Sequence, residues 1–231
     1  MIISPSAISP YKIPTFQSGG EVPFSFGNAL KFDGVNDYVS IPTIVLDGAF
    51  TISMWSKDVT PSDNPIIGDI GAGGWITYRK SVNRLRFNNP TIGTVTLNPI
   101  AGIKTNEWNH FFITRGAANL VTVIINGDTP KTGTINGTFT FTALGARDGV
   151  AGLTNIIQDE FAIWNTVLTP TDALNLYNSD NGDYATNYSP ENLQAYWRMN
   201  GTSGDSTATD EQGTYNGTLI NFNTATCWVA H

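Results

Sequence analysis

The acidic side chains are the residues of this sequence best suited to chemistry, yet their spacing does not form a catalytic pair. Hydrolysis of a glycosidic bond needs two carboxyl groups that face each other across a cleft, roughly 5 to 9.5 Å apart. Asp159 and Glu160 are adjacent, and neighbouring side chains of a strand point to opposite faces. None of the glutamates has a partner acid at the two-residue spacing of one strand face: Glu21, Glu107, Glu160, Glu191 and Glu211. We therefore predict no catalytic residues and no enzyme activity.

The histidines and the cysteine offer no second route to catalysis. His110 lies within an apolar strand pattern, where a lone histidine is typically a hydrogen-bonded core residue, and His231 is the last residue. A nucleophilic triad would also need a Gly-x-Ser-x-Gly turn, which the sequence lacks, as it lacks a phosphate-binding glycine loop. Cys227 is the only cysteine, so the chain can form no internal disulfide.

Composition limits the classes of partner. Only 13% of the 231 residues are charged, against about 25% in average globular proteins. The net charge of -7 comes without a clustered basic surface, which argues against nucleic acid. No apolar run approaches the roughly 18 residues of a membrane span, and the first residues lack the pattern of a signal peptide. We expect neither nucleic acid binding nor membrane insertion.

The elements that must position any site are strands, because apolar residues alternate at two-residue spacing. Two apolar half-strands flank an acidic turn at Asp33 to Asp37, and a hairpin is predicted over 75–79 and 84–87. Asn126-Gly127 is typical of a two-residue hairpin turn. One helix is expected from Thr169, with Pro170 in its first turn, to about residue 178.

Several of these runs carry a family resemblance. Leu-Lys-Phe-Asp-Gly-Val-Asn-Asp-Tyr-Val-Ser-Ile-Pro at 30–42 and Phe-Thr-Ile-Ser-Met-Trp-Ser-Lys at 50–57 resemble the opening strands of laminin-G-like domains of the concanavalin A-like lectin and glucanase superfamily. Trp-Asn-His-Phe at 108–111, Ile-Ile-Asn-Gly at 124–127 and the strand at 157–165 continue the likeness in order. The resemblance implies an all-β, antiparallel jelly-roll sandwich of the concanavalin A-like type, with one short helix.

The chain divides into an extended N-terminal arm, 1–27, and a laminin-G-like domain, 28–231. The arm holds four prolines, which disfavour a helix or a central strand: Pro5, Pro10, Pro14 and Pro23. Its apolar residues favour packing against its own domain or a neighbouring copy, which would make a homo-oligomer; the alternative is a disordered leader. We expect the late strand around 195–199 to pair beside the 30–42 stretch.

Two sites are predicted. Trp75, Tyr78 and Arg79 combine flat aromatic surface with donors near a long loop, which suits glycans; the alternative is a sandwich strand with solvated charges. Relatives often hold a structural calcium, which the resemblance carries over to Asp210 and Asn216, with Asp159 as a third ligand. Gln212 and Thr214 depart from the usual Asp-x-Ser-Gly-Asn pattern, and the alternative is that Asp210 caps backbone amides.

These features favour a non-enzymatic structural protein of a virion surface: a phage capsid-decorating, head fibre or tail protein, which such laminin-G-like chains resemble. It would contact other virion proteins through the arm and adhere to host or environmental glycans. The alternative is an extracellular carbohydrate-binding module of a secreted bacterial protein.

Overall fold

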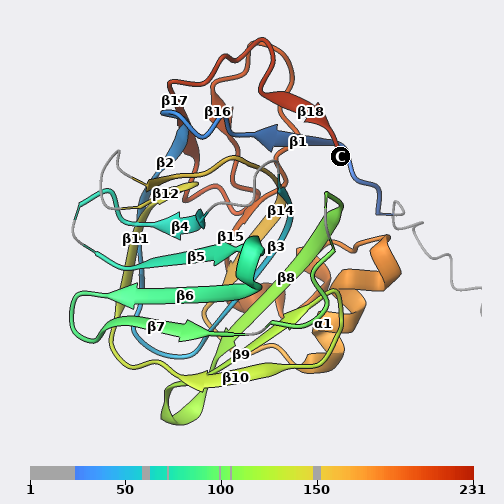
Figure 1. Cartoon of the computed structure of the whole chain (residues 1–231). Helices are drawn as coiled ribbons and strands as arrows, with labels where there is room; N and C mark the ends of the chain where they lie inside the picture. Colours follow the sequence, from blue (N-terminus) through green and yellow to red (C-terminus); the bar gives the residue numbers. More distant parts are fainter. Residues whose placement is uncertain (1–23, 59–62, 72, 99, 105, 148–151) are drawn as a thin grey trace, which may run out of the picture.

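The protein is a sandwich of two antiparallel sheets, seen in a computed structural model (Figure 1). The structure describes residues 24–58, 63–71, 73–98, 100–104, 106–147 and 152–231. The predicted all-β jelly-roll sandwich is confirmed, and the described residues hold a single α-helix. None of the helices in these ranges is long and apolar enough to cross a membrane.

Sheet A has eight strands. Seven follow the order β10 (Lys131–Thr134), β9 (Leu120–Ile125), β8 (Trp108–Arg115), β3 (Phe50–Asp58), β14 (Ile156–Trp164), β1 (Asn28–Lys31) and β18 (Trp228–Ala230). The eighth, β15 (Leu193–Trp197), also pairs with β14. β1 and β15 therefore pair with successive parts of β14, so the expected pairing of the late strand beside the 30–42 stretch is wrong.

Sheet B faces sheet A across the core. Its order is β16 (Thr207–Ala208), β17 (Gly217–Ile220), β2 (Tyr38–Leu46), β11 (Phe139–Leu144), β4 (Asp63–Gly68), β5 (Trp75–Arg79), β6 (Arg84–Asn89) and β7 (Gly93–Leu97). The predicted hairpin is confirmed as β5 and β6, and a separate pair joins β12 (Ala146–Arg147) to β13 (Gly152–Leu153). Inward-facing aliphatic and aromatic side chains of both sheets fill the space between them.

The acidic turn after β1 connects the two sheets rather than closing a hairpin. β1 lies in sheet A and β2 in sheet B. The Asp33 Oδ1 accepts hydrogen bonds from the backbone of Val35 and Asn36, and Gly34 takes a positive φ of 75° that favours glycine. The acids of this stretch therefore shape the turn.

The helix α1 (Pro170–Tyr177) covers part of the outer face of sheet A (Figure 1). Its predicted start is confirmed: the Thr169 hydroxyl accepts from the Asp172 amide, and the Asp172 carboxylate accepts from the Thr169 amide. Ala173 and Leu176 pack with Phe112 and Trp164 of sheet A in a second apolar cluster. This outer face is thus largely buried.

The division of the chain at residue 28 stays a prediction. Residues 1–23 of the expected arm lie outside the described residues. Phe24 and Phe26 do pack on the domain, where the Phe24 ring meets Tyr184 at 4.9 Å and the Phe26 ring meets Trp55 at 5.2 Å between centroids.

Candidate functional site

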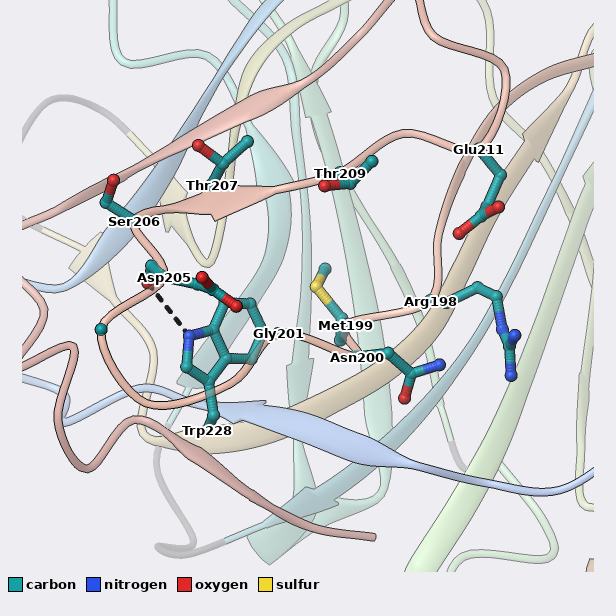
Figure 2. A pocket seen from close by; sticks show the side chains of 11 residues that line it. Arg198, Met199, Asn200, Gly201, Asp205, Ser206, Thr207, Thr209, Glu211 and Trp228 are labelled. Atoms are coloured by element: carbon teal, nitrogen blue, oxygen red, sulfur yellow. Dashed lines mark hydrogen bonds between the residues drawn. The ribbon is translucent and has the colours of Figure 1, made fainter.

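A pocket lies at the end of the sandwich where β15, β16 and β18 meet. We call it the rim pocket; its volume is about 540 Å³. Figure 2 shows Arg198 and Glu211 at one end and Trp228 with Asp205 at the other. Most of its lining is polar: Arg198, Met199, Asn200, Gly201, Gly204, Asp205, Ser206, Thr207, Thr209, Glu211 and Trp228.

Trp228 is held in place by the loop that follows β15. Its indole N–H donates to the Asp205 carbonyl at 3.0 Å (Figure 2). A Cβ at Gly201 would lie 2.4 Å from atoms of the Trp228 ring, so only glycine leaves room for the ring there. The Asp205 carboxylate in turn accepts from the Thr202 amide at 2.6 Å and its hydroxyl at 2.9 Å, which fixes the turn. The indole is therefore preorganised in the pocket wall.

Arg198, at the other end, is oriented from below by a buried acid. Its Nε lies 3.3 Å from the Glu160 Oε1, and its guanidinium lies over the Tyr184 ring at 4.8 Å. Glu160 also accepts a hydrogen bond from the Tyr196 hydroxyl. These contacts limit the freedom of the guanidinium, so its donors can be presented to a ligand at low entropic cost.

Glu160 reaches this position because β14 contains a β-bulge. The register with β3 shifts between Asp159 and Ala162, and Glu160 has a positive φ of 49°. The residues on either side of the two acids point into the core: Gln158 donates to the Ile66 carbonyl of sheet B, and Phe161 belongs to the inner core. Asp159 and Glu160, which lie between them, therefore both point to the outer face of sheet A. The expectation that Asp159 and Glu160 point to opposite faces is therefore wrong, because the extra residue breaks the alternation.

Burial controls the ionisation of this acidic pair. Desolvation raises the pKa of Asp159 to about 8. Desolvation, together with the neighbouring Asp159 charge, raises the pKa of Glu160 to about 8, against the lowering effect of Tyr196 and Arg198. Both carboxyls are buried beneath other side chains, so they do not face each other across an open cleft as a hydrolytic pair would.

The rim pocket itself holds two carboxylates, Asp205 and Glu211. Hydrogen bonds from the Thr202 amide and hydroxyl lower the pKa of Asp205. A glycosidic general acid needs the opposite shift, because it must hold its proton near neutral pH. The ionisation of Asp205 therefore suits hydrogen bonding to a ligand better than proton donation.

The residues predicted to bind glycans do not share one surface. Trp75 and Arg79 lie on the outer face of sheet B, whereas Tyr78 points into the core and packs on Phe111 at 5.0 Å between centroids. The guanidinium groups of Arg86 and Arg147 lie over the Trp75 ring at 5.1 and 4.8 Å, which leaves that residue 4% exposed. A glycan role for these residues stays a prediction, and it cannot rest on an open Tyr78 ring.

The predicted calcium ligands do not fit the ion as they are arranged. Asp210 accepts four backbone N–H groups, two on each carboxylate oxygen, from Tyr196, Gln212, Thr214 and Tyr215. Those bonds fill the roughly four lone-pair sites of a carboxylate. The Asn216 Oδ1 accepts from the Asp210 amide at 2.8 Å, while Asp159 lies on sheet A with the His231 Nδ1 2.6 Å from its Oδ2.

This geometry supports the alternative role of Asp210, which is to brace the turn before β17. Within the described ranges, no group of three or more His, Cys, Asp and Glu side chains is arranged to hold a metal ion. The segment from 210 to 216 therefore stabilises one side of the rim pocket through hydrogen bonds to its backbone.

Comparison with protein families decides the identity of the fold. The model of the concanavalin A-like lectin/glucanases superfamily, of the laminin-G type, matches residues 33–174, more than half of the chain. The chain belongs to this superfamily. No curated protein matches it.

Two solved structures show the same fold at low sequence identity. A candidate carbohydrate binding protein from Bacteroides ovatus aligns with a TM-score of 0.61 and 16% identity, over 86% of this chain and 59% of that protein. A heptameric SAP-like pentraxin from Limulus polyphemus aligns with a TM-score of 0.53 and 14% identity, over 65% of this chain and 82% of the pentraxin. At such identities the likeness shows a lectin-like fold alone.

The sequence did not point to the rim pocket. Arg198 and Trp228 are thirty positions apart, and only the pairing of β15 with β14 and of β18 with β1 brings their ends together. A weak signal was the run Gly-Thr-Ser-Gly-Asp-Ser-Thr at 201–207, in which small and hydroxyl residues follow a strand.

Proposed function

We propose that the chain is a non-catalytic glycan-binding domain that holds a neutral sugar in the rim pocket. The observation that carries this proposal is the preorganised Trp228 indole, set in a wall of hydroxyl, amide and carboxylate groups. A sugar ring presents C–H groups that pack on an indole and hydroxyls that bond to such polar groups. The superfamily membership and the Bacteroides ovatus likeness agree with this role.

The charges in the rim pocket favour a neutral sugar. Asp205 and Glu211 bring two carboxylates, whereas Arg198 brings a single cation that Glu160 already faces from below. An acidic sugar would meet like charge there, which disfavours binding. A neutral glycan can instead donate its hydroxyls to both carboxylates and accept from Arg198 and Asn200.

A glycan array of neutral and acidic oligosaccharides tests this function. The intact chain should bind neutral glycans, and Trp228→Ala and Asn200→Ala should each weaken that binding, the first by about tenfold. Asn36→Ala, in the exposed turn after β1, is the matched control and should bind as the parent does. An array on which the parent and the Trp228→Ala chain give the same signals would rule the site out.

We propose the surface of a virion as the setting of this domain, with a secreted bacterial protein as the alternative. The low fraction of charged residues and the proline-rich stretch at 1–27 support it, since such a stretch can reach along other virion proteins. Electron microscopy of phage particles labelled with antibody against this chain tests the setting. Label on secreted material but never on particles would favour the alternative.

A further inference from the structure

A second pocket lies on the outer face of sheet A, away from the rim pocket. We call it the sheet A pocket; its volume is about 350 Å³, which is at the lower end of the roughly 300 to 1,000 Å³ of small-molecule sites. It shares no lining residue with the rim pocket. Its lining residues are Phe26, Trp55, Lys57, Lys104, Asn106, Glu107, Trp108, Asp180 and His231.

His231 is clamped between two aromatic rings in this pocket. Its ring stacks on Phe26 at 3.5 Å and on Trp108 at 3.9 Å between centroids, with interplanar angles of 10° and 5°. Its Nδ1 lies 2.6 Å from the Oδ2 of Asp159, a carboxyl with no exposed surface. The His231 amide also donates to the Gly27 carbonyl at 3.2 Å. The orientation of the imidazole is therefore fixed from three sides.

The hydrogen bond to Asp159 decides what the other ring nitrogen offers. Burial lowers the pKa of His231 to about 4 and raises that of Asp159 to about 8, so between these values the pair carries two protons, one on the ring and one on the carboxyl. The carboxyl proton lies in the 2.6 Å contact between Oδ2 and Nδ1, and the ring proton then lies on Nε2. Nε2 has no hydrogen-bond partner among the described residues, so an N–H donor faces the pocket.

Lys57 supplies a positive charge beside this donor. It lies opposite Trp108 in the pairing of β3 with β8, and its charge contributes to the lowered pKa of His231. Lys104 is neutralised by Asp180, with both carboxylate oxygens 2.6 Å from its Nζ. Lys57 makes no ion pair with any described carboxylate. Glu107, which also lines the pocket, is exposed. The pocket thus combines a half-buried cation, an N–H donor and aromatic walls.

We propose that the sheet A pocket binds a single six-membered ring that carries a carboxylate, with the carboxylate between the Lys57 ammonium and the His231 Nε2–H. The ring packs against the aromatic side chains that line the pocket, on the parts of Trp108 and Phe26 that His231 does not cover. A uronic acid sugar and an aromatic acid share this chemistry, because each joins a flat apolar surface to one anion. The site is independent of the rim pocket, so it does not depend on neutral sugar binding there.

Histidine ring signals in NMR test this site directly. The chain has two histidines, and His110 is fully enclosed with its Nε2 2.7 Å from the Ser53 hydroxyl, so it serves as an internal reference. Glucuronate, benzoate and neutral glucose are titrated into the full chain labelled with ¹⁵N-histidine. Glucuronate, benzoate or both should shift the His231 ring signals to saturation, while those of His110 do not move. The acid that binds more tightly shows whether the pocket is suited to a uronic acid sugar or to an aromatic acid.

Charge variants complete the test. Lys57→Gln should weaken acid binding by about tenfold, and Lys57→Arg should restore most of it. Lys31→Gln, which removes an exposed lysine of β1, is the matched control and should bind as the parent does. The proposal is overturned if neither acid shifts His231, if glucose shifts it equally, or if Lys57→Gln binds as tightly as the parent.

Discussion

The two pockets differ in how the chain builds them and in the charge that each presents. Loops and strand ends form the rim pocket, whose hydroxyl-rich wall contains two carboxylates and one guanidinium. The sheet A pocket is lined by aromatic rings on a flat sheet face, with a half-buried lysine. One sandwich can therefore offer a site for a neutral polar ring and a site for an anionic ring, and the difference lies in the charges beside each indole.

The supporting carboxyl groups differ in the same way. The Asp210 carboxylate beside the rim pocket accepts four backbone N–H groups, so it acts as a rigid brace. Asp159 below the sheet A pocket keeps its proton because burial raises its pKa, and Glu160 next to it behaves likewise. The structure of the rim pocket should therefore be sensitive to the loss of hydrogen bonds, and that of the sheet A pocket to pH.

The largest effect is expected from Asp210→Ala. Loss of the carboxylate leaves four backbone N–H groups without their acceptor, and we expect the free energy of unfolding to fall by about 3 kcal/mol. Urea denaturation measures the change, and Asp128→Ala, in an exposed loop, should cost less than about 0.5 kcal/mol. A loss for Asp210→Ala as small as that of the control would show that the turn does not need the brace.

The acidic pair should make stability depend on pH. The folded pKa values of Asp159 and Glu160 are raised to about 8 from model values of 3.8 and 4.5. Their stabilising contribution is therefore complete below about pH 4 and is lost as pH rises through 8. Glu160→Gln removes one of the two groups that hold a proton more tightly in the folded chain than in the unfolded chain. Between pH 5 and 8 the free energy of unfolding should therefore fall less steeply with pH, by up to about 1.4 kcal/mol per pH unit.

Denaturation curves at pH 5, 6.5 and 8 check this expectation. Glu211→Gln, which changes an exposed carboxylate of the rim pocket, is the control and should leave the slope of stability against pH unchanged. Equal slopes for the parent and the Glu160→Gln chain would mean that Glu160 is already ionised when folded.

Of the two pockets, only the rim pocket should bind its ligand more weakly in Gly201→Ala. The added Cβ would lie 2.4 Å from the Trp228 ring, so the indole must move. We expect a stability loss of about 1 kcal/mol and about tenfold weaker binding of neutral glycans. Binding of glucuronate or benzoate in the sheet A pocket should not change. Gly204→Ala is a poor control because Gly204 has a φ of 96°, whereas Gly48→Ala meets no atom within 4 Å and should be neutral.

The smallest effect is expected at Ser53, below the aromatic residues of sheet A. Burial lowers the pKa of His110 to about 3, so this ring stays neutral and its hydrogen bond with the Ser53 hydroxyl is between uncharged groups. Ser53→Ala should therefore cost only about 1 kcal/mol. Histidine ring signals should show no titration of His110 between pH 5 and 8; a midpoint in that range would contradict the burial of the ring.

The fold was predictable from the sequence because its signals are local. Alternating residues such as Phe50, Ile52 and Met54 and the Thr169 cap each act over a few positions, and both elements form as expected. The Asn126-Gly127 turn forms, with the Asp128 amide donating to the Ile125 carbonyl, but it does not close a two-residue hairpin, because β9 and β10 pair only from Val123 and Lys131 outward. The two apolar half-strands of the 30–42 stretch also form, although the turn between them joins the two sheets.

The sites were not predictable in the same way because they depend on breaks in local rules. The Asp159 and Glu160 side chains share a face only because Glu160 adopts a positive φ, which few non-glycine residues do. The glycan site at Trp75 and Tyr78 was predicted from their aromatic side chains. Strand alternation instead places Tyr78 in the core, and two arginines cover the Trp75 ring. Trp228 and His231 come late in the chain and reach their pockets through the pairing of β18 with β1.

One NMR experiment on the full chain, with its tryptophans and histidines labelled with ¹⁵N, tests the contrast between the pockets most directly. Glucose, galactose and N-acetylglucosamine are titrated as neutral probes and glucuronate and benzoate as the acidic probes, with the Trp228 indole signal assigned from Trp228→Ala. A neutral sugar should shift the Trp228 indole signal and leave His231 unchanged, and at least one of the two acids should do the reverse. Shifts of both signals by the same probe, or of neither by any of the five, would contradict the account.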